Sequence, residues 1–324
     1  WYSQNGEAQD VMQVGDLPTP SPQAGEVLVR MACSGVNPSD VKSRRARPLT
    51  DPLVVPHSDG AGVIEAVGEG VSSARVGERV WVWNGQWQRP MGTCAQYIAL
   101  PAAQAVTLPE GVDFAAGACM GIPGLTAVQA VILAERLAGD LRGQTVLVTG
   151  ASSAVGHYIT QMVTLVGGRV IGTVGSEAKA AHARAAGMQD AIFYKTESVP
   201  ERVKALTQGR GADVIIDMDF STTAGWASEG ALAPHGQVVC YGSNALEVPL
   251  PFRPWLFQSM GVKFFLVYDL TPADRQTAVA RLSGMLAAGQ LQHSIGARYA
   301  LHQVAQAHRT VEAGQTVGNV VIDL

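Results

Sequence analysis

The residues at 149–156, Thr-Gly-Ala-Ser-Ser-Ala-Val-Gly, have the types and spacing of a phosphate-binding turn. They follow a short apolar run at 145–149 and open a stretch of helical character at about 154–167. Small side chains let backbone N–H groups approach a pyrophosphate, and the positive end of the helix dipole stabilises its charge. The glycine pattern is degenerate, because Ala151 and Ser153 occupy two of its positions, and an ordinary strand-to-helix turn uses similar residues. Together with the strand and helix units that follow it, the turn predicts a dinucleotide site.

The end of the next predicted strand, 169–174, indicates which nicotinamide cofactor binds. NAD sites usually carry Asp or Glu about twenty residues past the glycines, where the carboxylate binds the ribose 2′-hydroxyl. Here Gly175 and Ser176 stand at the strand end, the first acid is Glu177, and Lys179 follows. A hydroxyl and an ammonium suit a 2′-phosphate, so we expect NADPH. The alternative is that Lys179 is a solvated helix residue.

The predicted secondary structure around this turn changes twice along the chain. Residues 1 to about 115 contain short β-like runs broken by Gly and Pro, which is typical of an all-β unit. From about 116 to 260, buried β-branched runs alternate with helical stretches, which predicts a doubly wound parallel sheet. The predicted strands of this part are 145–149, 169–174, 191–193, 213–217 and 236–241. The tail adds a helix at about 272–289 and a strand at 318–323.

Composition excludes several classes of function. The 324 residues suggest about two domains, and 47% hydrophobic residues are enough to build cores. A net charge of −4 without a basic stripe argues against nucleic-acid binding. No apolar run reaches the 18 residues of a membrane span. The four scattered cysteines indicate reduced thiols, hence a cytoplasmic protein. The sequence opens at Trp1 rather than Met, so we expect native residues before it, and no leader is supported.

Short-chain dehydrogenases share the Thr-Gly-Ala turn, but the sequence argues against them. They carry the turn near the N-terminus and need a catalytic Tyr-x-x-x-Lys pair. Here the turn begins at 149, and none of the seven tyrosines has Lys four residues later.

Five motifs, which occur in a fixed order along the chain, resemble those of a different dehydrogenase family. They are Ser-Gly-Val-Asn-Pro-Ser-Asp at 34–40, the run from His57 to 71, Val-Gly-Glu-Arg-Val at 76–80, Gly-Ile-Pro-Gly-Leu-Thr-Ala at 121–127, and 146–156 followed by Gln161. Over essentially the whole chain, the sequence resembles the medium-chain dehydrogenase/reductase superfamily, within it the quinone oxidoreductase or zeta-crystallin branch. The resemblance implies a GroES-like β domain at 1–117 and 257–324 and a Rossmann domain at 118–256. It also implies NADPH in the cleft between the domains and, commonly, a homodimer.

The zinc ligands of related alcohol dehydrogenases are absent. Their positions fall on Asn37, Ser58 and Ile122, none of which is a plausible zinc ligand. The cysteine-rich lobe is missing as well, because 83–97 contains only Cys94. His57 is then better interpreted as a hydrogen-bonded or pocket-lining residue than as a lone ligand. We expect an enzyme that works without a metal.

The resemblance also implies residue roles. Asn37 and Asp40 correspond to the polar pair near the nicotinamide, and Lys42 replaces a tyrosine of relatives. Lys42 is either an anion stabiliser and proton donor or part of a solvated basic loop with Arg44, Arg45 and Arg47. Trp83 and Trp87 are either walls of the substrate pocket or packing residues. The expected cofactor residues are Thr126, Ser153, Ala154, Val155, Gly156, Gly175, Ser176, Lys179, Tyr194, Ser221, Gly242, Ser243, Asn244, Leu266 and Val267.

These features predict an NADPH-dependent, zinc-independent reductase. Its acceptor is expected to be a quinone or an alkene conjugated to a carbonyl, since direct hydride transfer to an electron-poor acceptor needs no metal. The alternatives are an enoyl-thioester or haloacrylate reductase on the same fold, or an NADPH-binding structural or nucleic-acid-binding protein.

Overall fold

A seven-stranded sheet organises the first of two units, formed by residues 1–124 and 283–324. The computed structural model describes all 324 residues. The strands follow the order β12-β13-β1-β2-β3-β5, with β4 also paired to β1. Their bounds are β1 Glu26–Val36, β2 Asp59–Val67, β3 Arg79–Val82, β4 Tyr97–Pro101, β5 Ala105–Thr107, β12 Ile295–Ala300 and β13 Asn319–Asp323. All pairs are antiparallel except β12 with β13.

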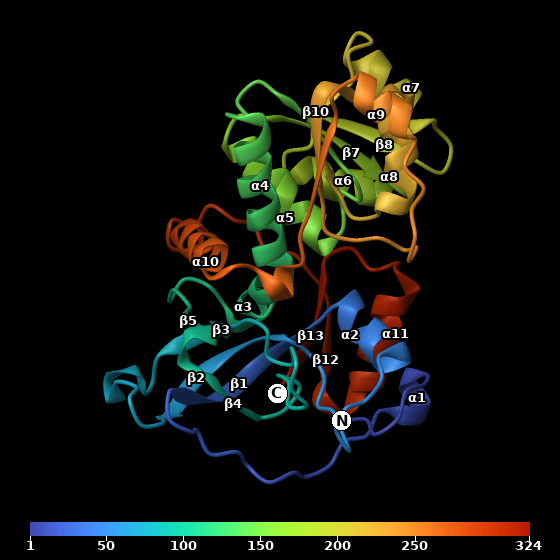
Figure 1. The fold of residues 1–324 in the computed structure, drawn as a ribbon. Coiled ribbons are helices and arrows are strands. Elements are labelled where there is room, and N and C mark those ends of the chain that lie inside the picture. The colour runs from blue at the N-terminus through green and yellow to red at the C-terminus, as the bar shows by residue number, and fades with distance from the viewer. The chain divides into compact units, whose positions relative to one another are not determined.

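Inward-facing residues of these strands form the core of this unit. Val27, Val29, Ile64, Val80 and Ile98 pack together with almost no exposed surface. The helices are α1 Ala8–Val11, α2 Pro38–Ala46, α3 Phe114–Gly117 and α11 Val304–Ala313, with short turns η1 Ser73–Arg75, η2 Ala102–Gln104, η3 Met120–Gly124 and η6 Leu301–Gln303. The helix α11 packs on β12, β13 and α2 (Figure 1). Pro38 at the first position and Asn37 as N-cap fix where α2 begins.

The second unit, residues 125–282, is built on a six-stranded parallel sheet. Its order is β11-β10-β9-β6-β7-β8, so the winding reverses beside β6. The strands are β6 Thr145–Val148, β7 Arg169–Val174, β8 Asp190–Phe193, β9 Ala212–Asp217, β10 Leu232–Cys240 and β11 Gly261–Phe264. Such a reversal leaves a crevice at the carboxyl ends of the strands, where ligands of doubly wound sheets bind.

Helices cover this sheet because its strands are apolar on both faces. The helices that begin in this unit are α4 Leu125–Ala138, α5 Ala154–Leu165, α6 Glu177–Ala185, α7 Val199–Leu206, α8 Phe220–Trp226, α9 Phe252–Phe257 and α10 Pro272–Ala287, the last of which continues past the end of the unit at residue 282. The turns are η4 Ala227–Ala231 and η5 Val267–Asp269. The helices α4 and α5 pack side by side (Figure 1). None of the helices combines the length and the hydropathy needed to cross a bilayer.

The architecture confirms the predicted α/β class, with a β domain and a doubly wound sheet. The sequence placed the sheet domain at 118–256, whereas the second unit runs from 125 to 282. The difference at its end arises because β11 pairs in parallel with β10, Gln237 opposite Gly261, and so extends the sheet past residue 256.

Candidate cofactor and catalytic site

The predicted cofactor residues of the second unit gather at one edge of the parallel sheet. All six strands run the same way, so their carboxyl ends meet at that edge. Ser153–Gly156 follows β6, Gly175 and Ser176 follow β7, and Tyr194 follows β8. Ser221 follows β9, Gly242 to Asn244 follow β10, and Leu266 and Val267 follow β11. Thr126 lies buried in α4, which packs near η5 and thus near Val267.

The turn after β6 is held in a form that only small residues permit. Gly150 has φ +63°, a left-handed conformation, and its N–H donates to Thr173 Oγ1 at 2.9 Å. Ser153 is the N-cap of α5, and its Oγ accepts the N–H of Gly156 at 3.0 Å. A Cβ on Gly156 would lie 2.2 Å from the carbonyl oxygen of Gly150. The first N–H groups of α5, at Ala154 and Val155, and the small side chains of this turn fit a pyrophosphate.

Two lysines flank the end of β7. Ser176 caps α6, and its Oγ accepts the N–H of Lys179 at 3.4 Å. A Cβ on Gly175 would meet the Tyr194 hydroxyl at 3.1 Å and Lys195 Cε at 3.5 Å, so both side chains lie beside the glycine. The nearby acid, Glu177, is neutralised, since its Oε1 lies 2.5 Å from Arg184 Nη1. The residues present fit a ribose 2′-phosphate.

Lys195 and Asp219 were not among the residues predicted from the sequence. Asp219 organises the next part of this end of the sheet. The Ser221 hydroxyl donates to Asp219 Oδ1 at 2.5 Å. The backbone and side-chain N–H groups of Asn244 donate to its two oxygens, both at 2.9 Å. Partial burial opposes ionisation of Asp219, but these hydrogen bonds hold its pKa below the ordinary value. Asp219 therefore positions two of the predicted cofactor residues.

In the first unit, the predicted pair Asn37 and Asp40 belongs to a buried chain of polar groups. The N–H of Asn37 donates to Asp40 Oδ2 at 2.8 Å, and its Nδ2 donates to Asp59 Oδ2 at 2.9 Å. Asp59, which the sequence analysis missed, is fully buried. Burial raises the pKa of Asp40 to about 7 and the pKa of Asp59 well above its ordinary value. Two carboxyl groups, linked through the backbone N–H and the side-chain amide of Asn37, can thus hold a proton near neutral pH.

The structure does not bring Lys42 to this pair. Lys42 stands two residues after Asp40 on α2, about 200° around the helix axis, and it is exposed. Trp87 lies instead under the guanidinium of Arg47, whose carbon is 5.4 Å from the ring centroid. Trp83 is half-buried.

His57 is part of a buried hydrogen-bond network. Its Nδ1 lies 2.9 Å from Ser34 Oγ and its Nε2 lies 2.9 Å from His308 Nε2. Burial and the second imidazole lower its pKa well below the ordinary value, so the ring stays neutral. Within the chain no three His, Cys, Asp or Glu side chains are arranged to hold a metal ion.

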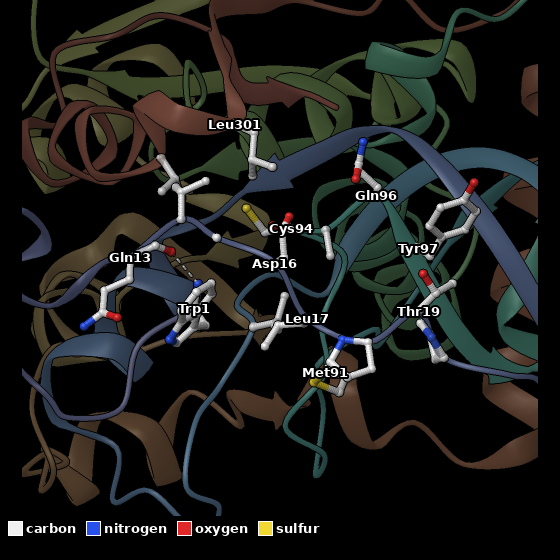
Figure 2. A pocket seen from close by; sticks show the side chains of 17 residues that line it. Trp1, Gln13, Asp16, Leu17, Thr19, Met91, Cys94, Gln96, Tyr97 and Leu301 are labelled. Atoms are coloured by element: carbon white, nitrogen blue, oxygen red, sulfur yellow. Dashed lines mark hydrogen bonds between the residues drawn. The ribbon is translucent and has the colours of Figure 1, made fainter.

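A separate cavity of about 140 Å³ in the first unit contains none of the predicted site residues. Figure 2 shows its walls, among them Trp1, Leu17, Met91, Cys94 and Tyr97. The amino group of Trp1 donates to the carbonyl oxygen of Gln13 at 2.9 Å along one side.

Comparison with known proteins gives matches over the whole chain. Residues 23–110 match the alcohol dehydrogenase GroES-like domain, and residues 154–284 match the zinc-binding dehydrogenase family. A quinone oxidoreductase of Pseudomonas aeruginosa is 31% identical over 97% of this chain and 95% of its own length. A 2-haloacrylate reductase of a Burkholderia species is 30% identical over 93% of this chain and 92% of its own. The structure of mycobacterial Rv1454c complexed with NADPH superposes with a TM-score of 0.86 and 28% identity, covering 100% of this chain and 98% of that one.

Proposed function

This chain belongs to the zeta-crystallin-like quinone oxidoreductase branch of the medium-chain dehydrogenase/reductase superfamily, and we propose that it reduces a quinone or an alkene conjugated to a carbonyl. It is an NADPH-dependent oxidoreductase. Bound NADPH supplies the hydride, and the protein supplies binding, orientation and the handling of the proton.

The observation that carries this proposal is the cluster of small, hydroxyl and cationic residues at the sheet edge. We assign the pyrophosphate to the turn at 153–156, where the first turn of α5 begins at Ser153 and Gly156 lets the helix pack closely against Gly150. We assign the 2′-phosphate to Ser176 and Lys179 at the start of α6 and to Lys195, whose side chain lies beside Gly175 at the end of β7. Tyr194 borders the same space.

The buried pair in the first unit supports a role near the reacting atoms. Hydride addition to a conjugated acceptor leaves an enolate or hydroquinone anion, which must be stabilised and protonated. Asn37 offers an amide donor, and the carboxyl groups of Asp40 and Asp59 retain a proton near neutral pH because they are buried. We propose Asn37 and Asp40 as the groups that meet the acceptor, with Lys42 as a second candidate donor.

A second candidate acceptor is a 2-haloacrylate or an enoyl thioester, because a 2-haloacrylate reductase is 30% identical to this chain. Steady-state oxidation of NADPH against quinones, enones, haloacrylates and enoyl thioesters separates these classes. A kcat/KM highest for quinones or enones supports the proposal, and turnover confined to the acids or thioesters would replace it.

We propose that the reaction needs no zinc. Asn37, Ser58 and Ile122 stand at the ligand positions of related zinc enzymes, and Asn37 is already bonded to both Asp40 and Asp59. Activity should survive exhaustive chelation, and metal analysis should find less than stoichiometric zinc. A chelator-sensitive enzyme with about one zinc per chain would contradict this.

We also propose a homodimer that forms through β11, the outermost strand of the parallel sheet, whose outer side is not paired. The edge strand β11 and the neighbouring α9 expose Phe252, Phe257 and Phe264 by 65%, 78% and 54%. Large exposed aromatic side chains next to an edge strand, which has one side free to pair, are typical of an interface. Light scattering should give twice the chain mass, and Phe264→Lys should shift the population toward monomer; a monomeric wild type would refute the interface.

The cysteines support a reducing, cytoplasmic location. Cys33, Cys94, Cys119 and Cys240 are all free and buried. Burial raises the pKa of each thiol, which keeps them protonated and unreactive.

A further inference from the structure

A second cavity in the first unit, of about 460 Å³, lies between the segment after α2 and the loop that follows β3. Cavities of this size hold small organic ligands. Its lining includes Tyr2, Arg47, Asp51, Trp87 and Arg89. Of these residues, the sequence analysis considers Trp87 as a possible wall of the substrate pocket and Arg47 only as part of a solvated basic loop.

The two arginines of this cavity differ from their neighbours in having no carboxylate partner. Arg44 is paired with Glu312, and Arg45 is paired with Glu7 and Glu312. Arg47 and Arg89 join no ion pair. Asp51, the one acid in the lining, accepts a hydrogen bond from the Thr50 hydroxyl at 2.8 Å and lies more than 4 Å from either guanidinium.

Arg89 is held in place by neutral groups. Its Nε donates to the carbonyl oxygen of Gly85 at 2.7 Å, and one Nη donates to Gln104 Oε1 at 3.0 Å. Burial lowers the pKa of Arg89, and the charge of Glu26, which makes no ion pair with it, opposes this effect only in part. The loop is itself fixed, since the N–H of Gly85 donates to the carbonyl oxygen of Ser58 at 2.8 Å. A positioned cation without a counterion is ready to bind an anion.

Arg47 adds an aromatic surface to this charge. Its guanidinium stacks over Trp87, which keeps the planar cation against the flat indole. Gln88 and Asn84, on either side of Trp87, have φ +57° and +53°, a left-handed conformation that few residues adopt without a reason.

We propose that this cavity binds a carboxylate on the acceptor, with Arg47 and Arg89 holding the anion and Trp87 contacting the flat conjugated part. The inference rests on the proposed reduction of a quinone or conjugated alkene and narrows the substrate to an acidic one. The carboxylate itself is unchanged in the reaction: NADPH gives a hydride, a proton is taken up, and a quinone becomes a hydroquinone.

The test compares a 1,4-benzoquinone that carries a carboxyalkyl side chain with its methyl ester, which keeps the ring and loses the charge. A charge-assisted hydrogen bond contributes a factor of about ten or more. We expect wild-type kcat/KM to favour the acid by at least about tenfold, and Arg47→Gln to remove this preference without changing the ester. Arg45→Gln, at the same end of α2 but paired with Glu7, is the matched control and should change neither.

Titration calorimetry of both probes onto the enzyme loaded with NADP⁺ gives the same comparison without turnover. If the enzyme reduces neither probe but binds the acid more tightly through Arg47, the proposed acceptor class is wrong and the anion site stands. If the ester binds as tightly as the acid, or if Arg47→Gln and Arg45→Gln weaken the acid equally, the anion site is refuted.

Discussion

Replacement of Gly156 by Ala tests whether the turn after β6 is shaped for a pyrophosphate. The new Cβ would lie 2.2 Å from the carbonyl oxygen of Gly150 and 2.9 Å from Ala151 Cα. Carbon and oxygen make close contacts at about 3.3 Å or more, so the turn must move by about 1 Å. Both obstacles are backbone atoms, and therefore no side-chain rotation relieves the clash. A shift of this size displaces the N–H groups that we assign to the phosphates.

Two effects of opposite sign act on stability. Overpacking costs about 1–3 kcal/mol, while Ala in place of Gly within a helix gains about 1 kcal/mol. The free energy of unfolding should therefore fall by about 0–2 kcal/mol, which leaves a folded protein. Loss of two phosphate hydrogen bonds at about 1.5 kcal/mol each weakens NADPH roughly 100-fold.

Gly225→Ala is the matched control, because Gly225 lies in α8 and its nearest neighbour would be Glu229 Oε1 at 3.9 Å. It should bind NADPH as wild type does and unfold at an equal or higher temperature. The assay is fluorescence titration with NADPH, together with thermal unfolding of the free protein. A folded Gly156→Ala variant whose Kd stays within about twofold of wild type would refute the assigned phosphate site.

Three further predictions concern titratable groups. Lys179→Ala and Lys195→Ala should each weaken NADPH about tenfold in fluorescence titrations and leave NADH nearly unchanged, since only NADPH carries the 2′-phosphate; equal losses for both cofactors would overturn the assignment. If Lys42 stabilises the product anion, Lys42→Met lowers kcat about tenfold at constant NADPH affinity, whereas an unchanged kcat and acceptor KM assign it to the solvated loop. Folding raises the pKa of Asp40 to about 7, so its contribution to stability is full below about pH 4 and is lost as pH rises through 7. Urea unfolding from pH 5 to 8 should show wild type losing a few kcal/mol relative to Asp40→Asn, and a constant difference would refute the raised pKa.

Local pattern was enough to predict the parallel sheet and the turn at 149–156. Buried β-branched runs, and small residues that follow a strand, can be recognised from neighbouring positions in the sequence. Their recognition does not depend on which strands pair in the sheet. Lys195 and Asp59 lacked such a signal. Lys195 reaches Gly175 because β8 pairs in parallel with β7, Val174 opposite Phe193, and Asp59 is enclosed because β2 sets it opposite Gly35. Strand register is a long-range property, so these neighbours could not be predicted from spacing along the chain.

The two units each contain an aspartate with a shifted pKa, but the shifts have opposite signs. This difference bears on which group donates the proton that follows hydride transfer. Asp219 accepts hydrogen bonds from Ser221 and from Asn244 near the surface, so it stays ionised and positions its neighbours. Asp40 is buried with fewer donors, and its raised pKa lets it carry a proton near neutral pH. Lys42, in contrast, is exposed on α2. An Asp40→Asn variant that keeps NADPH affinity but loses kcat would therefore place the proton on the buried pair. Full activity in that variant and in Lys42→Met together would leave water as the donor.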